Sequence, residues 1–185
     1  MSPTIQSLAT ELRSELKQFP NFPQEGILFE DFLPIFAKPD SFRKLVKAFE
    51  MHLQGQEIDY IVGLESRGFL FGPALALALN AGFIPIRKPG KLPGPVLSAE
   101  FVKEYGTDKF ELQEGVIPKD AKVIVVDDIL ATGGSASAAG ELIKKTGAKT
   151  VEYLFVMELD FLKGRDKLDA PVFTLLSGQS EKLGN

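Results

Sequence analysis

The chain has 185 residues, enough for one domain that can bury a full core. It contains no cysteine, which excludes disulfide frameworks and thiolate zinc sites. Its formal net charge of −4 gives no general attraction to nucleic acid or to a membrane surface, so an anion site would be a local feature. The chain shows no secretory signal pattern and no apolar run of roughly 18 residues, so we expect a cytoplasmic protein.

The first 55 residues predict two helices with an irregular segment between them. Apolar residues from Ile5 to Phe19 recur at steps of three and four, which predicts an amphipathic helix over residues 3–19 that Pro20 stops. Residues 20–39 are rich in Pro and Phe, and we expect irregular or short extended structure there. Asp40 is a plausible N-cap for a second helix that Gly55 ends.

From residue 58 onward, predicted strands alternate with predicted helices. We expect strands at 58–62, 83–86, 123–126, 151–157 and 172–176, and helices at about 68–80 and 135–146. This alternation predicts an α/β fold: one domain with a doubly wound, mainly parallel sheet flanked by helices. Ligands of such sheets bind outside the carboxyl ends of the strands, so the loops after residues 62, 86, 126 and 157 are the candidate site.

Residues 123–135 are the most informative segment. Four apolar residues are followed by Asp127 and Asp128, and then by a loop of small residues that contains Gly133 and Gly134. Amide groups at the start of a helix favour an anion, and glycine lets backbone approach a phosphate closely. The two aspartates are acceptors that suit the hydroxyl groups of a ribose. No Lys follows Gly134, so a Walker-type loop is discounted.

This segment resembles the signature with which type I phosphoribosyltransferases bind 5-phosphoribosyl-1-pyrophosphate (PRPP). The signature alone leaves open whether the chain is an enzyme or a regulator that only binds PRPP. The family often has a non-proline cis peptide in the loop after the first strand, and the resemblance implies one at Glu65–Ser66.

Two further loops carry cations. Arg67 follows the first strand, and Arg87, Lys88 and Lys91 lie in a stretch stiffened by Pro and Gly that contains no acid. Pyrophosphate leaves with growing negative charge, which fixed cations and a Mg²⁺ ion would stabilise. We therefore interpret these cations as pyrophosphate ligands, against the alternative of solvated surface groups.

Residues 96–112 alternate loosely between apolar and polar side chains. The pattern predicts two antiparallel strands joined by a turn around residues 106–108, with Glu104 and Tyr105 near the tip. Such a hairpin could be a flexible lid that excludes water from a reactive sugar cation, although an ordinary surface hairpin would give the same pattern.

Over nearly its whole length, the chain resembles the adenine-specific branch of the type I phosphoribosyltransferase family. The resemblance rests on residues 21–31, 63–72, 87–94, 104–106, the PRPP loop, 158–159 and 163–165. It implies an enzyme of purine salvage that makes AMP and pyrophosphate from adenine and PRPP with Mg²⁺. It also implies a cytoplasmic homodimer that binds neither nucleic acid nor membrane.

Carried over by position, the resemblance implies a set of site residues. Glu104 would manage the proton of the purine ring, and Asp127 with Asp128 would bind the ribose hydroxyls. The 5′-phosphate would lie on Ala131, Thr132, Gly133, Gly134 and Ser135. Pyrophosphate would meet Arg67, Arg87, Lys88, Lys91 and Tyr105, and adenine would meet Leu28, Phe29, Glu30 and Leu159. Within this scheme, residues 1–39 form an N-terminal helix and base-binding hood, 96–112 the lid, and 178–185 a frayed tail.

Three points stay open at this stage. Many relatives carry Arg where this chain has Glu30; if that side chain helps to fix the base, the electrostatics of the pocket differ here, while readout by backbone groups would survive. The alternatives to an adenine enzyme are a PRPP- or purine-sensing regulator on the same fold and an enzyme for another base, such as hypoxanthine, xanthine or orotate. His52, the only histidine, is interpreted as a helix residue without a catalytic task.

Overall fold

The fold is built on a five-stranded parallel sheet, in the order β4-β3-β7-β8-β9. A computed structural model describes residues 3–22, 25, 28–102 and 106–177 of the chain. The strands of the sheet are β3 (Tyr60–Leu64), β4 (Gly82–Ile86), β7 (Lys122–Leu130), β8 (Lys149–Glu158) and β9 (Val172–Leu176). This confirms the predicted α/β fold with a mainly parallel, doubly wound sheet.

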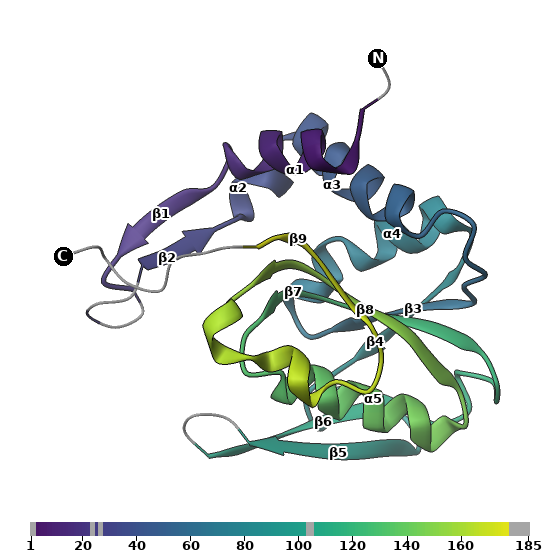
Figure 1. Cartoon of the computed structure of the whole chain (residues 1–185). Helices are drawn as coiled ribbons and strands as arrows, with labels where there is room; N and C mark the ends of the chain where they lie inside the picture. Colours follow the sequence, from purple (N-terminus) through teal and green to yellow (C-terminus); the bar gives the residue numbers. More distant parts are fainter. Residues whose placement is uncertain (1–2, 23–24, 26–27, 103–105, 178–185) are drawn as a thin grey trace.

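Helices cover both faces of the sheet (Figure 1). One face packs against α1 (Ile5–Arg13), α3 (Pro39–His52) and α4 (Gly72–Leu79), and the other against α5 (Gly134–Thr146). Neighbouring residues of β7 serve the two cores in turn, because successive side chains of a strand point to opposite faces. Ile124 and Val126 join the core under α3 and α4, whereas Val123 and Val125 join the core under α5.

The N-terminal segment differs from the prediction. The helix predicted over 3–19 ends at Arg13, and residues 17–20 instead form β1 (Lys17–Pro20), which pairs antiparallel with β2 (Leu28–Asp31). Phe19 lies in this ribbon, half exposed, and so leaves the apolar stripe of the helix. A short helix, α2 (Leu33–Ala37), follows, so residues 28–37 are more regular than expected. The second helix starts at Pro39 with Lys38 as N-cap, and Asp40 lies in its first turn.

Other boundaries shift by a few residues. The first strand of the sheet runs over β3 and not 58–62, and the helix predicted at 68–80 divides into a 3₁₀ turn, η1 (Arg67–Leu70), and α4. The largest correction concerns β7, which continues to Leu130, whereas we expected the strand to end at residue 126. Asp127 and Asp128 therefore lie within the strand, with Asp127 opposite Phe155 of β8.

Residues 96–113 form the predicted hairpin of β5 (Val96–Val102) and β6 (Thr107–Gln113). The hairpin packs on α5, on the side away from the sheet (Figure 1). Arg87 and Glu111 exchange both backbone hydrogen bonds, at 3.0 and 2.7 Å, which joins the hairpin to the chain leaving β4. Glu104 and Tyr105, together with the predicted tail at 178–185, lie outside the described residues.

Candidate active site

A cavity of about 240 Å³ opens at the carboxyl edge of the sheet. Its walls come from the end of β7, the start of α5, the loop after β3, the chain after β4 and the hairpin. The lining residues are Glu65, Lys88, Phe101, Val102, Asp108, Phe110, Asp127, Thr132, Gly134 and Ser135. Three of the loops singled out in the sequence therefore meet in one pocket, and the hairpin covers it as well.

The loop of residues 131–135 has the backbone that its glycines permit. Gly133 has a φ of +77° and is the N-cap of α5, a left-handed conformation that few other residues adopt readily. Gly134 lies close under the hairpin, because a Cβ there would be 3.1 Å from the carbonyl oxygen of Val102. The first amide groups of α5 have no partner within the helix and are available to an anion.

The two aspartates occupy different environments. Asp128 is 3% exposed, and its Oδ2 lies 2.6 Å from Nε of Arg67, although no aligned hydrogen bond reaches that oxygen. Asp127 faces the cavity. Burial, reinforced by the charge of Asp128, raises the pKa of Asp127 well above its ordinary value. Acceptors of this kind fit hydroxyl groups that donate to them, as a ribose does.

Arg67 stands at the start of η1, as predicted, and is held between two groups. Besides its pairing with Asp128, its guanidinium lies 5.8 Å from the centre of the Phe32 ring, within the range of a cation–π contact. The turn that Arg67 opens depends on Gly68, where a Cβ would lie 2.6 Å from the carbonyl oxygen of Val126. The peptide bond Glu65–Ser66 is cis, which confirms the expectation for this loop.

The basic stretch after β4 is paired with an acid that the sequence analysis did not single out for binding. Glu65 accepts hydrogen bonds from Arg87 at 3.2 Å, from Lys91 at 2.7 Å and from the amide of Lys88 at 2.9 Å. Burial of the Glu65 carboxyl opposes ionisation, but the bonds from Lys91, Lys88 and Arg87 outweigh it and lower the pKa of Glu65 to about 2. We call this set of four residues the Glu65 clamp. It gathers two cations, Arg87 and Lys91, and the backbone of Lys88 on one carboxylate at the cavity, while the ammonium group of Lys88 lies 3.6 Å from Asp108.

The predicted adenine residues lie on two separate elements. Leu28, Phe29 and Glu30 belong to β2, and Leu159 follows the last residue of β8. Glu30 is 8% exposed and accepts a hydrogen bond from Gln18 across the ribbon, while its second oxygen is buried without a partner. Phe29 packs edge-on against Phe22, with 5.1 Å between ring centres. None of these four residues lines the cavity at the phosphate loop.

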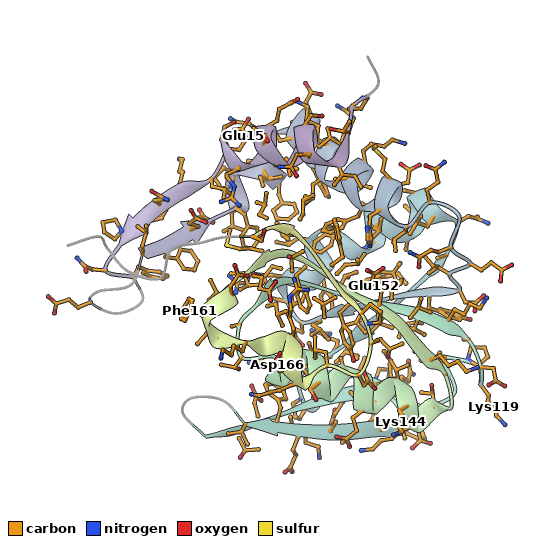
Figure 2. The ribbon with its side chains drawn as sticks, in the orientation of Figure 1. Glu15, Lys119, Lys144, Glu152, Phe161 and Asp166 are labelled. Atoms are coloured by element: carbon orange, nitrogen blue, oxygen red, sulfur yellow. The ribbon has the colours of Figure 1, made fainter. Side chains whose placement is uncertain are left out.

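His52 lies in a helix, as predicted. It ends α3, stacks on Phe173 with 3.7 Å between ring centres and lies 2.8 Å from Glu152 of β8. Glu152, labelled in Figure 2, is 8% exposed and lies near the start of β8, whereas the cavity opens at the carboxyl edge of the sheet. Two functional features escaped the sequence analysis: Glu65, which stood in a quoted loop next to the cis bond, and the aromatic pair Phe101 and Phe110, whose ring centres are 4.8 Å apart at the cavity wall.

The parallel sheet, the acid pair on β7 and the glycine loop at the start of α5 together define a type I phosphoribosyltransferase. In agreement, residues 35–182 match the family described as "Phosphoribosyl transferase domain". Proteins named adenine phosphoribosyltransferase are similar over almost the full length. That of Candida albicans is 76% identical over 178 residues, 96% of this chain and 95% of the relative. That of Debaryomyces hansenii is 73% identical over 181 residues, 98% of this chain and 97% of the relative.

A solved structure extends the similarity to three dimensions. The adenine phosphoribosyltransferase of Saccharomyces cerevisiae, crystallised with an imino-altritol bisphosphate and adenine, has a TM-score of 0.90 and 64% identity, covering 92% of this chain and 99% of that one. The chain belongs to the adenine phosphoribosyltransferases, enzymes of purine salvage that convert adenine and PRPP to AMP and pyrophosphate.

Proposed function

We propose that the cavity between β7, α5 and the hairpin binds PRPP, and that adenine attacks its anomeric carbon from the side of β2 and Leu159. The observation that carries this proposal is the meeting of Asp127, Thr132, Gly134, Ser135 and Lys88 in one pocket at the carboxyl edge of the sheet. An anion loop, a hydroxyl acceptor and a cation are the groups that the 5′-phosphate, ribose and pyrophosphate of PRPP require.

The phosphate loop binds the 5′-phosphate in this proposal. Residues Ala131, Thr132, Gly133, Gly134 and Ser135 supply amide groups and two hydroxyl groups at the N-terminus of α5. The dipole of α5, a helix of 13 residues, adds to the attraction for an anion. Asp127, which lines the cavity, and Asp128 hold the ribose hydroxyls.

The cations of the Glu65 clamp, together with Arg67 and Tyr105, receive the pyrophosphate. The leaving group gains negative charge as the bond to the anomeric carbon breaks, and cations fixed beforehand stabilise that charge without reorganising. Glu65 holds Arg87 and Lys91 in place before the substrate arrives.

On the base side, Glu104 exchanges the proton of the purine ring as its nitrogen attacks. A carboxyl group suits this task when a closed site raises its pKa toward neutrality. Phe29 and Leu159 contact the ring, and the backbone of residues 28–30 reads its amino edge. The hairpin closes over the sugar and limits hydrolysis of a reactive intermediate.

The residues present fit a Mg²⁺ ion that is bound mainly through PRPP. Among the described residues, no group of three or more His, Asp or Glu side chains could hold a metal by itself. Asp127 nevertheless offers a carboxylate in the cavity, and Mg²⁺ is commonly held by one or two carboxylates plus substrate phosphates. When bound, the ion would neutralise charge on the pyrophosphate.

A homodimer in the cytoplasm is part of the proposal. The helix α4 is apolar on all sides, and Leu77 on it is 83% exposed, which is unusual for a surface that stays in water. Within the part of the chain that the structure describes, no helix is long and apolar enough to span a membrane. Light scattering should give the mass of two chains, and Leu77→Lys should shift it toward one.

The test of the function is a spectrophotometric screen of the purified chain with PRPP, Mg²⁺ and one base at a time. Adenine should be consumed, and hypoxanthine, xanthine and orotate should not. The double variant Asp127→Asn with Asp128→Asn should bind PRPP about 10- to 100-fold more weakly in calorimetry, because two hydrogen bonds to charged groups are lost. Binding of PRPP without turnover of any base would indicate a sensor, and turnover of another base would change the assigned substrate.

A further inference from the structure

The segment that follows β8 runs directly behind the phosphate loop. It comprises Leu159, the 3₁₀ turn η2 (Asp160–Leu162), Lys163 and a second turn, η3 (Gly164–Lys167). Figure 1 shows it in yellow-green, turning back toward α5, and Figure 2 labels Phe161 and Asp166 along it. Contacts between α5 and η3 place this segment against the helix that the phosphate loop opens.

The contact with the phosphate loop is made by backbone against backbone. A Cβ on Gly133 would lie 2.3 Å from the carbonyl oxygen of Gly164. In return, a Cβ on Gly164 would lie 2.2 Å from the carbonyl oxygen of Ala131 and 2.9 Å from the amide nitrogen of Gly133. No side chain stands between the two segments at this point, so the position of Gly164 limits how closely the backbone of the phosphate loop can approach this segment.

Arg165, the next residue, ties this segment to the sheet. Its Nε donates to both carboxylate oxygens of Glu158, at 2.7 and 2.9 Å, and its second amino group pairs with the same carboxylate. Further bonds reach the carbonyl of Val172 at 3.1 Å and the hydroxyl of Thr174 at 3.2 Å. Glu158 is 3% exposed and ends β8, so the planar guanidinium joins the end of β8 to the first half of β9.

The same anchor serves the base side of the site. Leu159 follows Glu158 directly, and its amide donates to the carbonyl of Leu130 at 2.9 Å, where β7 passes into the phosphate loop. A shift of Glu158 would therefore move Leu159 and Gly164 together. Neither Glu158 nor Arg165 lines the cavity of the site.

We propose that Arg165 is a positioning residue that, through Gly164, sets the shape of the 5′-phosphate loop and, through Glu158, the place of Leu159 against the base. This inference rests on the proposed function of that loop. One guanidinium outside the pocket thereby couples recognition of the two ends of the product nucleotide, while the pyrophosphate cations on the opposite wall are held independently by Glu65.

The test uses a different ligand for each wall of the site, the phosphate loop and the pyrophosphate cations. Ribose 5-phosphate probes the phosphate loop, AMP probes the loop and the base contact together, and pyrophosphate with Mg²⁺ probes the cation wall. Arg165→Lys keeps a positive charge beside buried Glu158 but loses the planar fork, so the segment loosens without leaving a charge unpaired. Gly164→Ala pushes on the loop directly.

Tyr153→Phe is the matched control. The Tyr153 hydroxyl donates to Asp169 at 2.7 Å and so also links β8 to the chain before β9, but it makes no contact with Gly133. The Tyr153→Phe variant should be less stable than wild type and should bind all three ligands with unchanged affinity. Thermal unfolding of each variant shows whether it folds; should Gly164→Ala fail to fold, Arg165→Lys decides alone.

Calorimetry of Arg165→Lys should show ribose 5-phosphate and AMP binding about 10- to 100-fold more weakly, as for other displaced supporting groups, with pyrophosphate affinity unchanged. In steady state, KM for PRPP should rise. Unchanged ribose 5-phosphate affinity in a folded Arg165→Lys, or an equal loss for pyrophosphate, would overturn the proposal. A wild-type chain that does not bind ribose 5-phosphate or AMP would instead refute the proposed function of the loop.

Discussion

The raised pKa of Asp127 makes the stability of the folded chain depend on pH. Burial, and then the charge of Asp128, raise the pKa of its carboxyl group. Between the ordinary and the raised pKa, the folded chain binds more protons than the unfolded chain. Stability therefore falls as the pH rises through that window, and the loss persists at neutral pH. In the proposed function, ribose hydroxyls donate hydrogen bonds to this carboxylate, so ligand binding would offset the cost of ionising it.

We predict that Asp127→Asn raises the Tm of the ligand-free protein at pH 7. Removing a charge of this kind typically adds about 1 kcal/mol, or about 2–4 °C for a chain of this size. The gain should shrink as the pH is lowered to 4, where wild-type Asp127 is protonated as well. Calorimetric scans over this range check it, with Asp120→Asn at an exposed turn as a control that should change little. A lower Tm at pH 7 would contradict the assignment.

Glu104 carries a separate prediction, which concerns rate. Glu104→Leu should lower kcat about 10²- to 10⁴-fold, as is usual when a general acid or base is removed, and should change PRPP affinity far less. Glu100→Leu, on the exposed side of β5 in the same hairpin, is the matched control and should retain activity. Wild-type turnover by Glu104→Leu would reject the proton-transfer role.

At the scale of elements, the Glu65 clamp joins the loop after β3 to the chain after β4. Because its hydrogen bonds lower the pKa of Glu65 from 4.5 to about 2, the clamp contributes stability that is fully present above pH 4.5 and is lost as the pH falls toward 2. Partial exposure of the lysine and arginine lets solvent screen these pairs, which limits the contribution to about 1–2 kcal/mol.

We expect Glu65→Gln to lower the Tm at pH 7 by a few degrees, and we expect its difference from wild type to shrink as the pH falls toward 2, because protonation of Glu65 weakens the same pairs in the wild-type chain. Thermal melts at matched pH values test this. The control is Glu57→Gln, which removes an exposed pair with Lys122 and should have no measurable effect. A difference between Glu65→Gln and wild type that stays constant down to pH 2 would show that charge is not the cause.

Features set by residues close together in sequence were predictable, and features set by distant residues were not. The alternation of strands and helices, the hairpin and the glycine loop were predictable, because each is set by neighbours within one element. The strand at residues 17–20 was not, because its apolar spacing continues that of the preceding helix, and only pairing with β2 decides the outcome. The same holds for Asp127 and Asp128, which the partner strand β8 keeps within β7.

The sequence predicted which residues belong to the candidate site, but it did not predict which of them contact one another. Arg67 and Asp128 are 61 positions apart in sequence, and nothing in their local pattern shows that they meet. The loop with Arg87, Lys88 and Lys91 contains no acid, so its own sequence suggested an unopposed patch of positive charge. The opposing carboxylate comes from another strand end, and only the parallel order of β3 and β4 brings it within reach.

At the scale of the whole molecule, the packing of α5 against the sheet leaves little room for larger side chains. The core under α5 depends on small residues on the helix, where Ala136, Ala139 and Gly140 let it approach the sheet closely. Gly140 is the tightest point, because a Cβ there would lie 2.1 Å from the hydroxyl oxygen of Tyr153. The tyrosine ring itself lies farther away, with its nearest atom 3.4 Å from that position.

This geometry predicts opposite signs for one substitution in two backgrounds. Gly140→Ala in the wild-type chain should cost about 1–3 kcal/mol, the usual range for overpacking, since the buried hydroxyl must move and its bond to Asp169 is disturbed. In a Tyr153→Phe background the hydroxyl is gone and the Asp169 carboxylate, at 3.2 Å from the Cβ position, is no longer bonded to it and is free to shift, so the better helix propensity of Ala should add up to about 1 kcal/mol. Denaturant unfolding of the four chains measures the coupling between the two sites. If Gly140→Ala lowers the free energy of unfolding equally in both backgrounds, the Tyr153 hydroxyl is not what limits the approach of α5 to the sheet.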